Sequence, residues 1–146
     1  MVDIAREPLA KVLDEVWPLV MVQWNSDDTL ETEPNFNIER YLALNVSNHY
    51  LQYTIRDNDV LVGHCGMMVF PALRDRLLYA SDEFIYIVPE YRGKCFDRLL
   101  KYMENDLTEM GVKELAFRPH IKSKFGRLLG FKGYEPVATI HRKKLA

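Results

Sequence analysis

A helical stripe lies between two strand-like runs in the second half of the sequence. Apolar residues fall at positions 96, 99, 100, 103, 107 and 110, which is the spacing of one helix face. The run before it, about 77–88, has the centre "FIYIV", apolar on both faces like a strand covered on both sides, and Pro89 should end its pairing. Gly111 is a natural helix end before "VKELAFR", a predicted strand. A helix between two strands predicts a parallel crossover.

The middle and the end of the chain predict further sheet. "YLQYTIR" alternates, "DND" is a turn signal, and "VLVGHCGMMVF" resumes as a strand, so these runs predict an antiparallel hairpin. "KSKFGRLLGF" predicts a short helix, and "YEPVATIHRKKL" predicts a final strand. Together the elements indicate a mixed α/β (α+β) fold.

Two helices are predicted before the hairpin. The dipeptide "EP" at 7–8 can open the first, because proline suits a first helical turn. Pro18 should kink or end this helix. Asn37 can cap a second helix that continues to about Val46, with Leu42 and Val46 facing inward.

The length and composition favour one cytosolic domain. The chain has 146 residues, which predicts a single domain over 1–146. A net charge of −2 gives no general attraction to nucleic acid or membrane. Cys65 and Cys95 form no CxxC pair, which predicts no disulfide framework and no metal site and fits a reducing compartment. No apolar signal-peptide region opens the sequence, so we expect a cytoplasmic location.

The stretch "YRGKCFDRLL" (91–100) stands where the strand ends and the helix begins. A helix N-terminus has free N–H groups and a partial positive charge, which makes it an anion site. Arg92, Lys94 and Arg98 add charge, and Gly93 lets a ligand approach the backbone. The alternative is a solvated turn that carries several basic residues.

The segment "IVPEYRGKCFDRLLKYMENDLTEMGVKEL" and the later "GYEPV" resemble the GCN5-related N-acetyltransferase (GNAT) family. "EVWPLVMVQW" and the hairpin are similar to members encoded by tailed bacteriophages, which would place the protein in the host cell cytoplasm. The resemblance implies a mixed, mostly antiparallel sheet with one splayed parallel strand pair and helices on both faces. It also implies an acetyl-CoA-dependent N-acetyltransferase whose amine acceptor is a small molecule or a protein. A homodimer is left open.

The resemblance also implies the site residues. Pantetheine of acetyl-CoA would pair with backbone groups of Ile85, Ile87 and Val88. The pyrophosphate would meet the N–H groups of the next loop, at Arg92, Gly93, Lys94, Cys95, Phe96, Asp97 and Arg98. A carboxylate early in the splayed strand would be the base, and Glu83 fits that role slightly better than Asp82. The alternative for both carboxylates is simple solvation.

The loop departs from the family pattern at two positions. Counted from Arg92, the family has a glycine where Cys95 stands and a glycine or alanine where Asp97 stands. Cys95 would add bulk, and Asp97 would add negative charge near a diphosphate. No tyrosine stands at the family's usual general-acid position. These departures favour the alternative function, a catalytically inactive GNAT-fold protein that acts as a binding, regulatory or virion-associated module.

Overall fold

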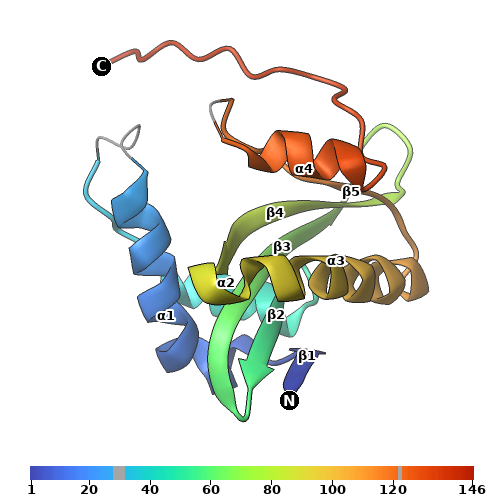
Figure 1. Cartoon of the computed structure of the whole chain (residues 1–146). Coiled ribbons are helices and arrows are strands. Elements are labelled where there is room, and N and C mark those ends of the chain that lie inside the picture. The colour runs from blue at the N-terminus through green and yellow to red at the C-terminus, as the bar shows by residue number, and fades with distance from the viewer. Residues whose placement is uncertain (28–31, 122) are drawn as a thin grey trace.

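The computed structural model describes residues 1–27, 32–121 and 123–146. In these residues one sheet runs in the order β1-β2-β3-β4-β5 (Figure 1), with strands β1 (Val2–Arg6), β2 (Tyr50–Asp57), β3 (Val60–Pro71), β4 (Leu78–Ile87) and β5 (Val112–Ala116). The neighbours from β1 to β4 are antiparallel, and β4 and β5 are parallel. The predicted mixed, mostly antiparallel sheet is therefore confirmed, as are the hairpin and the crossover.

Helices cover both faces of the sheet. They are α1 (Leu9–Ser26), α2 (Ile38–Val46), α3 (Arg92–Glu109) and α4 (Phe125–Phe131), with a short 3₁₀ turn, η1 (Pro89–Tyr91), between β4 and α3. α3 crosses the front of the sheet in Figure 1 and packs into a cluster that includes Leu51, Tyr53, Ile55, Leu99, Met103 and Leu107. On the other face α1 packs against β4 through a cluster that includes Val12, Val16, Val20 and Phe84. No helix in the described part of the chain is both long and apolar enough to cross a bilayer.

α1 continues through Pro18, where the sequence analysis expected a kink or an end. A proline in a helix interior removes one N–H donor, and this typically costs about 3 kcal/mol. The helix extends to Ser26 because it buries side chains on both sides of the proline, at Val12, Val16 and Val20. Pro18 lies on the exposed side of α1, so its ring does not disturb the packed face.

α2 differs from the prediction at one of its two expected inward positions. Asn37 caps it as expected, but Val46 is 86% exposed. Leu42 is half-buried, as are Tyr41 and Asn45, so the prediction fails at Val46 alone. The Asn45 side chain accepts a hydrogen bond from the first residue of α1 and donates one to the Tyr50 carbonyl, at 2.9 and 2.8 Å. These two hydrogen bonds join α2 to the start of α1 and to β2.

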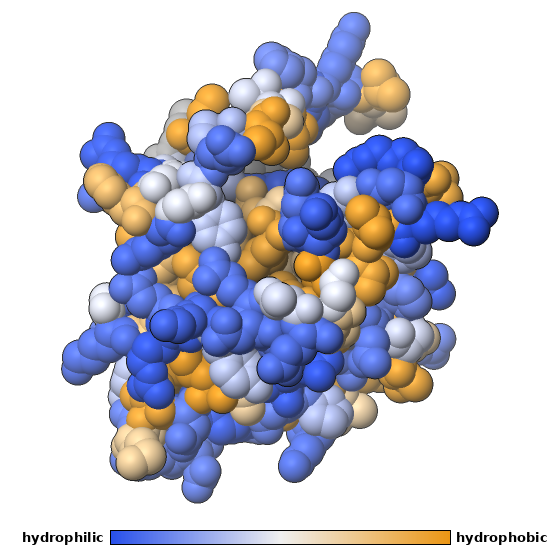
Figure 2. Space-filling view, turned by 90° about the vertical axis from the view of Figure 1, so that its right-hand side faces the viewer, coloured by the Kyte–Doolittle hydropathy of each residue, from blue (hydrophilic) through white to orange (hydrophobic). Residues whose placement is uncertain are grey.

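The two ends of the chain also differ from the prediction. Residues 2–6 form the edge strand β1, which the sequence analysis did not expect. Residues 134–145, predicted as a final strand, have no strand pairing in the structure. This segment projects above the body of the molecule at the top of Figure 2, and its Val137 and Ile140 are largely exposed. Its second half is basic, so pairing it with β5 would bury little apolar area.

A row of buried polar side chains lies on the α1 side of the sheet. The Tyr50 hydroxyl donates to Gln52 Oε1 at 3.3 Å, and Gln52 Nε2 donates to His64 Nδ1 at 3.2 Å. His64 is fully buried, and this burial lowers its pKa to about 4. Gly66 makes room for the row, because a Cβ there would lie 1.9 Å from the Tyr50 hydroxyl oxygen.

We expect Gly66→Ala to lower the free energy of unfolding by roughly 1–3 kcal/mol, because the added methyl group overpacks the site against Tyr50. Gly93→Ala is the matched control, since a Cβ there meets no atom within 4 Å and alanine favours a helix. Urea unfolding of the three proteins measures the difference. Equal stability of wild type and Gly66→Ala would mean that Tyr50 moves aside without loss.

We also expect the free energy of unfolding to decrease as the pH falls, because of His64. Its folded pKa of about 4 lies below the unfolded value of 6.5, so between these values only the unfolded state binds the proton. The contribution is complete above the unfolded pKa and decreases as the pH falls toward the folded pKa. The difference between the two pKa values corresponds to roughly 3 kcal/mol. Urea unfolding across this pH range should show a flatter profile for His64→Gln, and parallel profiles would contradict the assignment.

Candidate active site at the split between two parallel strands

The pairing of β4 with β5 stops halfway along β4. The paired residues run from Leu78↔Val112 to Ser81↔Ala116, and β4 then continues to Ile87 with β3 as its partner. The Val88 N–H donates to the Val62 carbonyl of β3 at 2.9 Å. Backbone groups alternate in direction along an antiparallel strand, so Ile85 and Ile87 direct theirs away from β3. The side of β4 beyond Ser81 is therefore an open strand edge.

A contact from the chain after β5 closes the base of this split. The Arg118 N–H donates to Asp82 Oδ1 at 3.0 Å, and Arg118 Nη2 donates to the Asp82 carbonyl at 3.2 Å. Burial is the largest influence on the Asp82 carboxyl and raises its pKa, against the lowering effect of Arg118. Asp82 thus joins β4 to the chain beyond β5 at the point where the two strands separate.

Glu83 is the extra residue of a β-bulge. Gly66 pairs with Phe84 and Met67 pairs with Asp82, so Glu83 has no opposite residue on β3. A bulge re-aims the side chain that it carries. The Tyr41 hydroxyl of α2 donates to Glu83 Oε1 at 2.9 Å, and burial together with this carboxylate raises the pKa of Tyr41. Glu83 therefore lies on the α1–α2 side, and Asp82 on the side of Arg118.

The N-terminus of α3 meets the open edge of β4. Gly93 is exposed, and a Cβ added there would meet no atom within 4 Å, so its backbone is open to approach. Arg92 Nε donates to the Ile87 carbonyl at 2.7 Å, and its guanidinium lies 5.3 Å from the ring centre of Tyr86. Lys94 is exposed beside them. Both backbone groups of Val88 are already hydrogen-bonded: its N–H donates to the Val62 carbonyl, and its carbonyl accepts from the Tyr91 N–H in η1.

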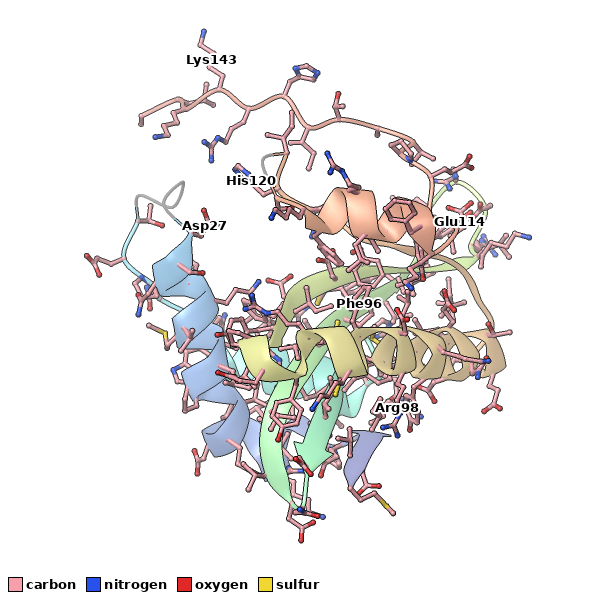
Figure 3. All side chains as sticks on the ribbon, viewed as in Figure 1. Asp27, Phe96, Arg98, Glu114, His120 and Lys143 are labelled. Atoms are coloured by element: carbon pink, nitrogen blue, oxygen red, sulfur yellow. The ribbon has the colours of Figure 1, made fainter. Side chains whose placement is uncertain are left out.

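The other predicted loop residues point elsewhere. Cys95 and Phe96 are buried in the hydrophobic cluster under α3. Asp97 pairs with Lys132 at 2.9 Å, beside the end of α4. Arg98 Nη2 donates to the Val2 carbonyl of β1 at 3.0 Å, and Figure 3 shows Phe96 and Arg98 on opposite sides of α3. The structure thus gathers Arg92, Gly93 and Lys94 near the edge of β4, not all seven residues.

The sequence analysis missed two residues at the site. No sequence pattern pointed to Arg118, because its contact with Asp82 follows only from the place where β4 and β5 separate. Tyr41 was hidden because the apolar spacing of α2 pointed to Leu42 and Val46. Tyr41 and Asn45 have the same four-residue spacing as Leu42 and Val46, so the sequence could also have suggested them as inward-facing residues. Among the described residues no cluster of His, Cys, Asp or Glu could hold a metal ion.

No protein-family model matches the sequence, and the search of curated proteins found no match. Solved structures match it over nearly its whole length. A ribosomal-protein-alanine N-acetyltransferase from Brucella melitensis biovar Abortus is 20% identical, with 99% of this chain and 98% of that chain covered at a TM-score of 0.74. An aminoglycoside antibiotic 6'-N-acetyltransferase from Acinetobacter baumannii is 15% identical, with coverage of 100% and 99% and a TM-score of 0.73.

A third similar structure is glucosamine-6-phosphate N-acetyltransferase from Arabidopsis thaliana, 11% identical, with coverage of 100% and 99% and a TM-score of 0.73. These three proteins act on chemically different acceptors, so the likeness indicates a shared scaffold and no particular substrate. The split between β4 and β5 also agrees with the splayed pair that the sequence resemblance implies. The chain therefore has the fold of these N-acetyltransferases over nearly its whole length.

Proposed function

We propose that the chain is an acetyl-CoA-dependent N-acetyltransferase that transfers an acetyl group to a primary amine. The open edge of β4, which has a bulged carboxylate near its start and the N-terminus of α3 at its end, carries this proposal. Acetyl-CoA, when bound, supplies an acetyl group activated as a thioester. The exposed backbone of Gly93, with no atom within 4 Å of its Cβ position, fits the close approach that a diphosphate needs.

The chain offers two kinds of contact to this co-substrate. Ile85 and Ile87 present backbone N–H and carbonyl groups that can pair with the amides of pantetheine, as a further strand would. Arg92, Gly93 and Lys94 stand at the first turn of α3, where the helix dipole and two side-chain charges favour a diphosphate. Arg92 would exchange its bond with the Ile87 carbonyl for a bond with phosphate.

The two departures from the family pattern, Cys95 and Asp97, oppose diphosphate binding less in the folded protein than the sequence alone suggests. The Cys95 side chain is fully buried, so its bulk is on the core side of α3 and not on the phosphate side. Asp97 has Lys132 at 2.9 Å, and this partner offsets the carboxylate charge. Both observations support binding of the co-substrate over the inactive alternative.

Glu83 is the proposed general base. A neutral amine must attack the thioester, so Glu83 takes a proton from the ammonium group of the acceptor. A C–N bond to the acetyl carbon forms and the C–S bond breaks, so that the CoA thiolate leaves. The second proton, which the nitrogen loses as it becomes an amide, passes through water to the thiolate. Tyr41 holds Glu83 through its hydroxyl. Asp82 serves the structure, through its bonds to Arg118.

Several finer expectations stay predictions. The cytoplasmic location, the homodimer and the likeness to phage-encoded members are among them.

A specific observation favours the inactive alternative: the Tyr134 hydroxyl, near α4, donates to Glu104 at 2.6 Å, so it is engaged and not offered to a leaving thiolate. Water must then protonate the thiolate, and turnover decides between the two functions.

We expect Glu83→Gln to lower kcat by roughly 10²–10⁴-fold with acetyl-CoA affinity nearly unchanged, because only proton removal is lost. Asp82→Asn should instead lower the melting temperature, since it weakens the link to Arg118. Glu109→Gln, at the exposed end of α3, is the matched control. Thiol release and calorimetric titration with acetyl-CoA measure the two effects.

Each outcome of that experiment separates the candidates. Normal turnover in Glu83→Gln would remove Glu83 from the base role. Binding of acetyl-CoA by the wild type without turnover, over a broad set of amines, would favour the inactive binding module. No binding of acetyl-CoA at millimolar concentration would reject the transferase and leave the inactive module.

A further inference from the structure

We propose that the Arg92 side chain is a gate that limits the site to co-substrates that carry a diphosphate. The inference rests on the proposed function and deepens it, because it concerns which carriers of an acetyl group the site accepts. In the free protein Arg92 closes one end of the open edge of β4. A diphosphate draws the side chain away and opens the edge, whereas a pantetheine thioester without a diphosphate meets the edge closed.

The gate is a hydrogen bond to a backbone carbonyl of the open edge. Arg92 Nε donates to the Ile87 carbonyl at 2.7 Å, a short distance that is typical of a charged donor. This carbonyl faces away from β3, because the next residue, Val88, directs its N–H to Val62 of β3 and backbone groups alternate in direction along a strand. Arg92 therefore occupies an acceptor that an amide N–H of pantetheine would otherwise use.

Tyr86 stabilises the closed position of the gate. The centre of its ring lies 5.3 Å from Arg92 Cζ, within the range of a cation–π contact. Tyr86 is half-buried and pairs with His64 of β3, so the ring stands on the paired side of the sheet. The hydrogen bond and the ring contact together select one position of a long side chain that could otherwise adopt many. Tyr86 is thus a positioning residue that acts through Arg92.

The charge of Arg92 is available to a ligand. Arg92 is exposed, and among the described residues no ion pair involves it. A guanidinium binds phosphate oxygens through two parallel hydrogen bonds, which are stronger than a bond with a neutral carbonyl. A diphosphate at the first turn of α3 therefore favours the open position. Pantetheine is uncharged and offers only amide and hydroxyl groups, so it must displace Arg92 without this gain.

The test compares acetyl-CoA with S-acetylpantetheine, which lacks the diphosphate and the nucleotide. Arg92→Ala removes the gate and the charge together, so the affinities for the two ligands should change in opposite directions. We expect the dissociation constant of acetyl-CoA to rise by about tenfold and that of S-acetylpantetheine to fall by about tenfold, the factor for one hydrogen bond with a charged group. NMR titration of the full chain measures both constants, because it also detects weak binding.

Two further variants complete the experiment. Lys101→Ala is the matched control, since it removes the same charge from an exposed position of α3, about two and a half turns beyond Arg92. It should leave both dissociation constants nearly unchanged. Tyr86→Leu distinguishes the gate from a simple contact with phosphate, because it loosens Arg92 and keeps its charge. Both ligands should then bind about threefold more tightly, the factor that a cation–π contact supplies.

The Arg92 Nε–H signal gives a readout that needs no ligand. In NMR spectra of the free wild type this proton should exchange slowly with water, because it is bonded to the Ile87 carbonyl. Saturating acetyl-CoA should shift the signal, and Tyr86→Leu should speed its exchange in the free protein. An Nε–H that exchanges as rapidly as that of a fully solvated arginine would contradict the closed position.

The outcomes separate this inference from the proposed function. Tighter binding of S-acetylpantetheine by Arg92→Ala, with weaker binding of acetyl-CoA, upholds the gate. Weaker, unchanged or absent binding of S-acetylpantetheine by Arg92→Ala would overturn the gate and leave the transferase intact if the wild type acetylates amines from acetyl-CoA. If the wild type binds neither ligand while Arg92→Ala binds S-acetylpantetheine, no diphosphate opens the edge, and the gate and the transferase are rejected together.

Discussion

The β4–β5 pairing ends at Ser81↔Ala116 while β4 continues, and the candidate site depends on this early end. An unpaired backbone group that is buried is unfavourable, so an open strand edge persists only where water or a ligand reaches it. Arg92 satisfies the Ile87 carbonyl in the free protein. The site thus combines backbone groups that seek partners with a helix end that favours an anion.

Packing on the α3–α4 side holds the two strands apart. Phe117, just after β5, contacts Phe125 of α4 and Tyr134, each with 5.6 Å between ring centres. Phe125 in turn contacts Phe96 of α3 at 5.6 Å. These contacts direct the chain after β5 toward α4, while β4 stays paired with β3. The bonds between Arg118 and Asp82 then fix the point where the strands separate.

Local sequence patterns predicted most of the fold, because hydrophobic periodicity and the proline and glycine signals at element ends depend on only a few neighbouring residues. The switch from strand to helical period placed the crossover. Pro89 begins η1 two residues after the end of β4, and Gly111, with a φ of 85°, lies two residues past the end of α3. The prediction at Pro18 was wrong because burial of a continuous helix face outweighed the loss of one backbone hydrogen bond. The final strand failed for the opposite reason, since its alternation has too little apolar area to bury.

The site was less predictable, because its partners come from distant segments. Asp97 suggested repulsion of a diphosphate until α4 brought Lys132 to it. Arg98 suggested an anion contact until β1, itself unexpected, supplied the Val2 carbonyl. Cys95 could have been placed from the sequence, because it lies four residues before Leu99 on the buried stripe. No spacing rule relates Tyr41 to Glu83, which are 42 residues apart.

Hydrogen exchange of single amides tests the central claim most directly. In the free protein we expect the N–H groups of Ile85 and Ile87 to exchange quickly, and that of Tyr86, paired toward His64 of β3, to exchange slowly. Saturating acetyl-CoA should slow Ile85 and Ile87 and leave Tyr86 unchanged, because pantetheine would pair with the open edge of β4. Unchanged exchange at Ile85 and Ile87 with acetyl-CoA present would contradict the account.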